Sequence, residues 1–215
     1  MWLRRIIATA WVTMSLVLAC PDAGQAAAGP VTLVVVGDSL SAGYGLAEQD
    51  AFPPKLERAL RAKGHDVRVV NAGVSGDTTA GGRARLAWTL GDDVDAVILE
   101  LGANDALRGL DTNQAFENLS AMLKALQSKG VPALLAGMKA PPNMGDEYVQ
   151  AFDAIYPRLA GIYDVTFYPF FLAGIVGRPA LNQADGMHPT PEGVDIIVAN
   201  ILPAVEKLLT RIRKS

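Results

Sequence analysis

The chain has 215 residues, of which 50% are hydrophobic, 7% aromatic and 19% charged, and its formal net charge at pH 7 is −3. This slightly acidic composition excludes the strongly basic surface that binding to nucleic acid requires. The single cysteine, Cys20, excludes an intramolecular disulfide and a zinc site built from several cysteines.

The amino terminus has the pattern of a secretory signal peptide. Residues 1–5 are a short basic start, residues 6–19 are apolar, and Ala26, Ala27 and Ala28 are small residues suited to cleavage. The apolar run has 14 residues, fewer than the roughly 20 that span a bilayer, so we expect no stable membrane span. We therefore predict a signal peptide at 1–28 and a periplasmic or secreted mature chain that begins near Gly29.

Processing at Cys20 is the alternative, since Val17-Leu18-Ala19-Cys20 loosely resembles a lipoprotein cleavage site. Pro21 and the downstream alanines favour soluble export instead. Without residues 1–28 the net charge is −4 and no cysteine remains. Residues 29–215 are enough for one domain that is stabilised by packing, and we expect a monomer.

The mature chain begins with a predicted strand at 31–36, which contains four valines and one leucine. A short β-branched run without alternation suits a strand that is buried on both faces of a parallel sheet. The strand stops at Gly37-Asp38-Ser39, where Asp38 and Ser39 could either cap the next helix or carry chemistry. A helix is predicted at 52–62, because its apolar residues have helical spacing and a glycine, Gly64, follows.

The same alternation continues to the end of the chain. The further predicted elements are a strand at 67–70, a polar loop at 71–79, a helix near 80–90, a strand at 94–101, a turn at 102–105, a helix between Asp111 and Gly130, a strand at 131–136, a mostly helical segment at 148–163, a strand at 165–171 and a helix that begins at Thr190-Pro191. We predict an α/β fold, a three-layer α/β/α sandwich around a parallel sheet of about five strands. A strand order of 2-1-3-4-5 would bring the polar turns together at the carboxyl edge of the sheet.

A serine hydrolase needs a base and a group that orients the base, and histidine is scarce in this chain. His65 precedes the second strand and would lie at the amino edge, whereas His188 follows the last strand and would share the carboxyl edge with Ser39. Asp185 is three residues before His188, across Gly186, so its carboxylate can reach the imidazole Nδ1. We predict Ser39, Asp185 and His188 as a catalytic triad.

Loops on either side of the first strand offer donors for an oxyanion. A backbone N–H at Gly73 or Gly76 and the side-chain amide of Asn104 could surround one oxygen. The G-x-S-x-G motif is absent around Ser39, and no H-E-x-x-H or C-x-x-C motif supports a metal. We therefore predict a serine esterase that needs no metal or other cofactor.

Four segments, 37–41 (GDSLS), 75–78 (SGDT), 102–105 (GAND) and 185–189 (DGMHP), resemble the four motif blocks of the GDSL/SGNH hydrolases, in the order of that family. Leu107-Arg108-Gly109 and other matches resemble its bacterial thioesterase I/lysophospholipase/arylesterase branch. The resemblance implies a flavodoxin-like SGNH hydrolase fold and an oxyanion hole from the N–H groups of Ser39 and Gly76 and the amide of Asn104. It also implies a periplasmic enzyme that hydrolyses aryl esters, lysophospholipids or acyl-CoA through an acyl-enzyme on Ser39.

Apolar residues after the third, fourth and fifth strands indicate how a small-molecule acyl ester or thioester would bind. Leu107, Leu110, Pro142, Phe170 and Phe171 would rim the site and form a groove for an acyl chain. One alternative is a carbohydrate O-deacetylase with the same motifs, although few aromatic residues are present to stack on sugars. A non-catalytic flavodoxin-like binding module is a further alternative, but the first turn lacks the glycines of a phosphate cradle.

Overall fold

The protein is described here from a computed structural model that defines residues 29–91 and 93–212. The predicted signal peptide at 1–28 and its Cys20 lie outside the described residues. Within the described residues, no helix has both the length and the apolar character needed to cross a membrane.

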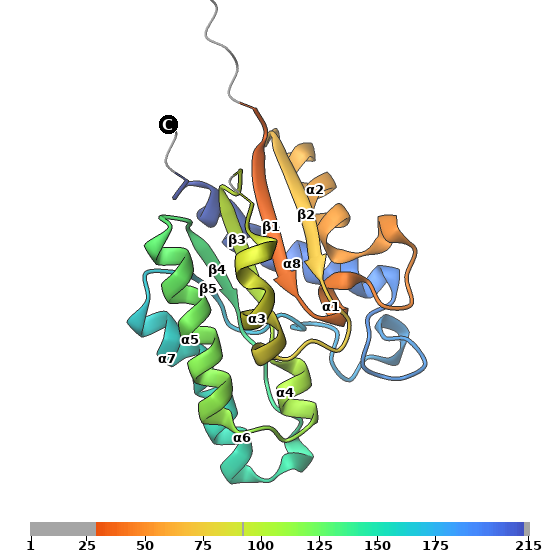
Figure 1. The fold of residues 1–215 in the computed structure, drawn as a ribbon. Coiled ribbons are helices and arrows are strands. Elements are labelled where there is room, and N and C mark those ends of the chain that lie inside the picture. The colour runs from red at the N-terminus through yellow and green to blue at the C-terminus, as the bar shows by residue number, and fades with distance from the viewer. Residues whose placement is uncertain (1–28, 92, 213–215) are drawn as a thin grey trace, which may run out of the picture.

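Five parallel strands form the central sheet, in the order β2-β1-β3-β4-β5 that the sequence predicts (Figure 1). β1 lies between β2 and β3, and all of its residues after the first are buried. Gly37, its last residue, is opposite Gly73 of β2 and Glu100 of β3. The strands are β1 (Val31–Gly37), β2 (Val67–Gly73), β3 (Ala96–Glu100), β4 (Ala133–Ala136) and β5 (Thr166–Tyr168).

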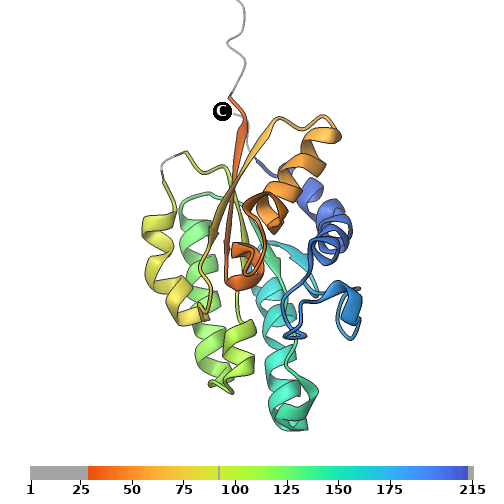
Figure 2. The same cartoon turned by 90° about the vertical axis from the view of Figure 1, so that its right-hand side faces the viewer.

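Helices cover both faces of the sheet, which gives the predicted three-layer sandwich (Figure 2). α2 and α8 pack together on one face, and α3 and α5 pack together on the other. The helices are α1 (Ser39–Ala42), α2 (Phe52–Ala62), α3 (Thr79–Thr89), α4 (Ala103–Leu107), α5 (Thr112–Ser128), α6 (Asp146–Asp153), α7 (Ile155–Ile162) and α8 (Pro191–Leu209), with 3₁₀ turns at Glu48–Asp50, Pro142–Met144 and Pro179–Leu181.

Helix α8 begins as predicted and follows the loop that contains His188. The side chain of Thr190 caps it by accepting a hydrogen bond from the N–H of Gly193, and Pro191 is its first residue. Its buried face consists of Gly193, Val194, Ile197, Val198, Ile201, Val205 and Leu208. Packing of this apolar face fixes the position of the His188 loop relative to the sheet.

Several element boundaries differ from the prediction. β2 continues to Gly73 because backbone pairing with β1 continues although the side chains turn polar. The predicted turn at 102–105 forms most of helix α4, and the predicted helix at 148–163 is divided into α6 and α7 at Ala154.

The predicted strand at 165–171 is also too long, because β5 ends at Tyr168. Phe171 is therefore not a rim residue. It is wholly buried and packs edge-to-face against Phe52, with 5.0 Å between the ring centroids. Burial in the core leaves Phe171 no exposed surface with which to contact a substrate.

Candidate active site

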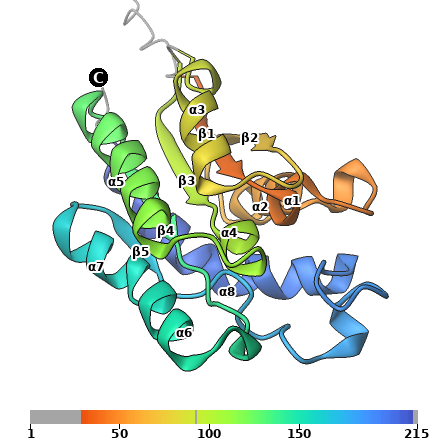
Figure 3. The same cartoon turned by 60° about the horizontal axis from the view of Figure 1, so that its bottom comes forward.

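The carboxyl ends of β1, β2 and β3 lead into the segments that hold the predicted site residues. Figure 3 brings this edge forward and shows α1, α4 and the loop before α8 at the same end of the molecule. Ser39 is the first residue of α1, and Asn104 lies in the first turn of α4. The sheet order therefore brings residues that are far apart in sequence to one edge.

Asp38 and Ser39 have separate local roles at the start of α1. The Asp38 carboxylate caps the helix by accepting a hydrogen bond from the N–H of Leu40 at 3.0 Å. Ser39 is partly exposed and directs its hydroxyl towards His188. The prediction of a helix cap thus holds for Asp38, whereas Ser39 is free to contact the histidine.

The predicted triad is assembled in the structure. Nε2 of His188 lies 2.9 Å from Oγ of Ser39, and Nδ1 of His188 lies 2.6 Å from Oδ2 of Asp185. The side chains of His188 and Asp185 are 16% and 32% exposed. This chain of hydrogen bonds is the arrangement that allows an imidazole to take a proton from a serine hydroxyl.

The loop around Asp185 keeps its carboxylate ionised. Its Oδ1 accepts hydrogen bonds from the backbone N–H groups of His188 (3.0 Å) and Met187 (2.9 Å). The bond from the His188 N–H is the largest of the effects that lower the pKa of Asp185 to about 2, ahead of the bond from the His188 side chain. Gly186 turns the chain with a φ of +71°, a conformation that favours glycine.

The other histidine lies away from the triad, as predicted. His65 lies in the short segment between α2 and β2, at the amino edge of the sheet. Its Nε2 is 3.2 Å from the Glu206 carboxylate on α8. His65 thus links the segment between α2 and β2 to α8.

The predicted oxyanion donor Asn104 lies beside the start of α1 and the loop that contains Gly76. The amide nitrogen of Asn104 donates to the carbonyl oxygen of Asp77 at 2.9 Å and lies 3.3 Å from Oδ2 of Asp38. It therefore contacts the residue before Ser39 and the residue after Gly76. The Gly73 N–H donates to the side chain of Asn71 at 3.0 Å, which favours Gly76 over Gly73 as the backbone donor.

Sequence reasoning missed a pair of buried carboxyl groups next to Ser39. Asp38 and Glu100 are both fully buried, and Oε2 of Glu100 lies 3.4 Å from the Asp38 N–H. Burial raises the pKa of Asp38 to about 6 and that of Glu100 well above its ordinary value, and in Glu100 the Asp38 charge adds to the effect. Nothing in the apolar pattern of the third strand indicates that its final glutamate turns inward.

Tyr44 is a further neighbour of the triad that the sequence did not indicate. Its ring lies against the His188 imidazole, with 4.6 Å between centroids and 37° between planes. The Gln183 side chain donates to the Tyr44 carbonyl at 2.7 Å, and the Gln183 N–H donates to the His188 carbonyl at 2.7 Å. Gln183 thus ties the histidine loop to the segment after α1.

The predicted rim residues differ in exposure. Leu107 and Leu110, at and after the end of α4, are 51% and 39% exposed. Pro142 is also exposed in its 3₁₀ turn, whereas Phe170 is half-buried with Nζ of Lys139 5.5 Å from its ring centroid. The two leucines are thus the apolar side chains near Asn104 that are most available to a ligand.

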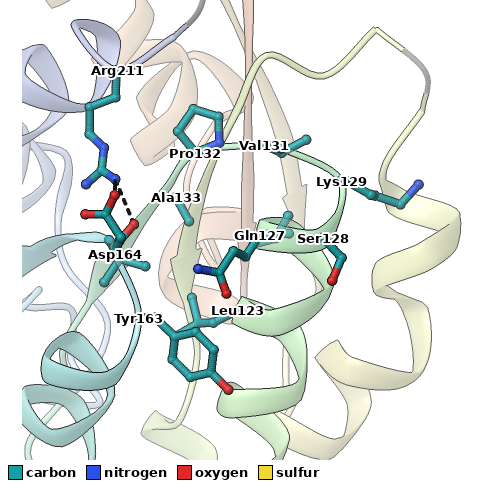
Figure 4. A pocket seen from close by; sticks show the side chains of 13 residues that line it. Leu123, Gln127, Ser128, Lys129, Val131, Pro132, Ala133, Tyr163, Asp164 and Arg211 are labelled. Carbon is teal, nitrogen blue, oxygen red and sulfur yellow. Dashed lines mark hydrogen bonds and ion pairs between the residues drawn. The ribbon is translucent and has the colours of Figure 1, made fainter.

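A hollow of about 650 Å³ lies at the amino edge of β4, away from the triad (Figure 4). Pro132 and Ala133 line it together with Tyr163 and an ion pair of 2.6 Å between Arg211 and Asp164. The triad occurs at the other end of the strands, so this hollow is separate from the candidate active site. Among the residues that the structure describes, no group of three or more His, Cys, Asp or Glu side chains is arranged to hold a metal.

The chain belongs to the GDSL-like lipase/acylhydrolase family, whose pattern matches residues 35–196. It is therefore a serine ester hydrolase. It is 42% identical to esterase TesA of Pseudomonas aeruginosa over 179 residues, which are 83% of this chain and 89% of that protein. It is also 39% identical to thioesterase 1/protease 1/lysophospholipase L1 of Escherichia coli K12, over 80% of this chain and 81% of that protein.

A solved structure is similarly close. The crystal structure of AlinE4, an SGNH-hydrolase family esterase, superimposes with a TM-score of 0.72 and is 47% identical. The match covers 85% of this chain and 98% of AlinE4. The five-stranded parallel sheet is therefore an SGNH hydrolase fold.

Proposed function

We propose that this esterase is exported and that it hydrolyses carboxylic esters and thioesters through an acyl-enzyme on Ser39. The observation that carries the proposal is the relay from Ser39 through His188 to Asp185, with separations of 2.9 Å and 2.6 Å. Export is supported by the basic, apolar and alanine-rich succession of residues 1–28.

In the proposed mechanism, His188 Nε2 takes the proton of the Ser39 hydroxyl while Oγ attacks the acyl carbon. The Asp185 carboxylate holds the imidazole with Nδ1 protonated and stabilises the imidazolium that forms. The imidazolium then gives its proton to the leaving alcohol or thiol. A water molecule, activated by the same imidazole, hydrolyses the acyl-enzyme and frees Ser39.

The negative oxygen of each tetrahedral intermediate is proposed to bind three N–H donors. These are the backbone N–H groups of Ser39 and Gly76 and the side-chain amide of Asn104. Ser39 supports this role because the N–H groups in the first turn of a helix have no partner within that helix. Gly76 is consistent with this role because the loop that would present its N–H has a φ of +84° there, a conformation that favours glycine.

The proposed substrates have a medium or long acyl chain that contacts Leu107, Leu110, Pro142 and Phe170. The exposed leucines support this preference because each buried methylene contributes up to about 0.8 kcal/mol. Relatives named thioesterase and lysophospholipase support acyl-CoA and lysophospholipids as classes to test. Leaving groups would remain outside the acyl groove, so aryl, thiol and glycerol leaving groups are all expected to be accepted.

Labelling with a fluorophosphonate tests the proposal. The probe should modify Ser39, as mapped by mass spectrometry, and Ser39→Ala should abolish the modification. His188→Ala should slow labelling greatly because the hydroxyl loses its base. Modification of another residue, or labelling that is unchanged in His188→Ala, would contradict the assignment.

A panel of aryl, lysophospholipid, acyl-CoA and acetyl-sugar esters then separates the substrate classes. The proposal expects activity on the first three and little on the acetyl-sugar. Preference for the acetyl-sugar would instead favour a carbohydrate O-deacetylase.

A further inference from the structure

An arginine outside the proposed relay connects three segments of the active-site edge. Arg85, on α3, donates to the carbonyl oxygens of Gly37 (2.9 Å) and Ala72 (2.7 Å). These residues lie at the carboxyl ends of β1 and β2, respectively. Its Nε also lies 2.6 Å from Oδ2 of Asp77, and the two side chains are only 20% and 15% exposed. One guanidinium therefore joins two strands to the loop between β2 and α3.

Asp77 extends this connection to two of the three proposed oxyanion donors, Gly76 and Asn104. It directly follows Gly76, and its carbonyl oxygen accepts a hydrogen bond of 2.9 Å from the Asn104 amide. The second hydrogen of that amide has the longer contact, 3.3 Å to Asp38. An oxyanion can therefore take the second hydrogen while the Asp77 carbonyl continues to hold the first.

The surroundings of Asp77 are fitted to this arrangement. A Cβ atom at Gly81, on α3, would overlap Oδ1 of Asp77, so the absence of a side chain there leaves room for the carboxylate. The Asp77 N–H donates to the Val74 carbonyl at 3.0 Å, which closes the turn that contains Gly76. The loop between β2 and α3 is thus held by the hydrogen bond between Asp77 and Val74 and by the contact of Asp77 with Arg85 on α3.

We propose that Arg85 is a positioning residue of the oxyanion hole, which it orders by holding Asp77. The inference rests on the proposed role of Asn104 as an oxyanion donor. Arginine suits this task because its charge is permanent and its donors form a rigid fork that can serve several acceptors at once. Arg85 does not reach the reacting atoms and acts only through Asp77, Gly76 and Asn104.

The same side chain could instead serve the fold alone, by tying the end of β1 to β2. A double-mutant cycle separates the two roles, because residues that act through one another are not additive. Arg85→Met should lower kcat by about 10- to 100-fold and change KM little, since a displaced donor costs transition-state binding. In the Asn104→Ala background, the same substitution should lower kcat by less than about threefold, because the amide that Arg85 helps to position is already absent.

Arg68→Met is the matched control. Arg68 lies on β2, its side chain is 51% exposed, and it pairs with Asp93 instead of with the active-site loop. It should leave kcat unchanged in both backgrounds. Arg85→Lys should recover part of the activity, because one ammonium can still reach Asp77 but cannot serve all three acceptors.

The outcomes are distinct. Equal losses for Arg85→Met in both backgrounds would overturn the positioning role and leave the proposed oxyanion hole intact. Full activity of Asn104→Ala alone would overturn the proposed oxyanion hole, and the inference with it. If Arg85→Met does not fold by circular dichroism, the same cycle with the isosteric Asp77→Asn decides the question, with the same expectation for kcat.

Discussion

The hydroxyl of Ser41 donates a hydrogen bond of 2.6 Å to Oε2 of Glu100, and so joins α1 to the end of β3. Gly37 makes this contact possible, because a Cβ atom there would overlap both Ser41 Oγ and Glu100 Oε2. Within the described residues, Oε1 of Glu100 has no hydrogen-bond partner. A wholly buried carboxyl with one such oxygen is far more stable neutral than charged.

Glu100→Gln is predicted to make the protein more stable relative to wild type as the pH rises. Burial holds the pKa of Glu100 well above its ordinary value of 4.5, so the folded state keeps a proton that the unfolded state releases above that pH. Wild-type stability therefore falls from about pH 4.5 up to the folded-state pKa, whereas glutamine does not titrate. Urea unfolding from pH 4.5 to 8 measures the difference, with Glu117→Gln on the exposed side of α5 as the control. If the difference in unfolding free energy between wild type and Glu100→Gln did not change with pH, the assignment of a neutral Glu100 would be wrong.

Ser39→Ala and His188→Ala are each predicted to abolish nearly all turnover and to leave the fold intact. Asp185→Asn should lower kcat by about 10⁴-fold, the cost of losing the group that orients the base in comparable triads. Steady-state hydrolysis of a p-nitrophenyl ester and circular dichroism measure activity and folding. His65→Ala is the control, since His65 contacts Glu206 at the other end of the sheet. Equal losses from His65→Ala and His188→Ala would show that the base is misassigned.

Longer acyl chains are predicted to raise kcat/KM from acetate upwards until the groove is full. Each added methylene that is buried against Leu107 and its neighbours contributes up to about 0.8 kcal/mol, or roughly fourfold. Measurement of kcat/KM for p-nitrophenyl esters from acetate to palmitate tests this series. Leu107→Ser should flatten it, whereas Ile162→Ser, at an exposed position at the end of α7, should not. A steady fall from acetate onwards that Leu107→Ser does not alter would exclude the groove.

The mature protein is predicted to begin near Gly29 and to be found in the soluble periplasmic or secreted fraction. The three alanines before Gly29 are small enough for signal-peptide cleavage. Amino-terminal sequencing and intact mass of the processed protein measure this. A lipid-modified Cys20 at the amino terminus would show that the alternative site is used.

Local sequence patterns were sufficient to predict the architecture and the proximity of Ser39, His188 and Asp185. Apolar strands and amphipathic helices alternate regularly, and crossover rules then restrict the order of the strands to very few choices. The three-residue step from Asp185 to His188 is short, so their contact depends on one loop. Ser39 could be matched to His188 instead of His65 because each histidine's place relative to a strand determines its edge of the sheet.

Only the tertiary structure decided the contacts that surround this triad. Glu100 and Ser41 are 59 residues apart, and Arg85 meets Gly37 across 48 residues. Such pairs leave no periodic or motif signal, because they depend on which side chains the packed helices turn towards the sheet edge. Phe171 shows the same limit, since an aromatic residue after a short strand can face either solvent or core. Whether Phe171 is buried depends on the volume that Phe52 and the other core side chains leave for its ring. The order of residues along the chain does not show that volume.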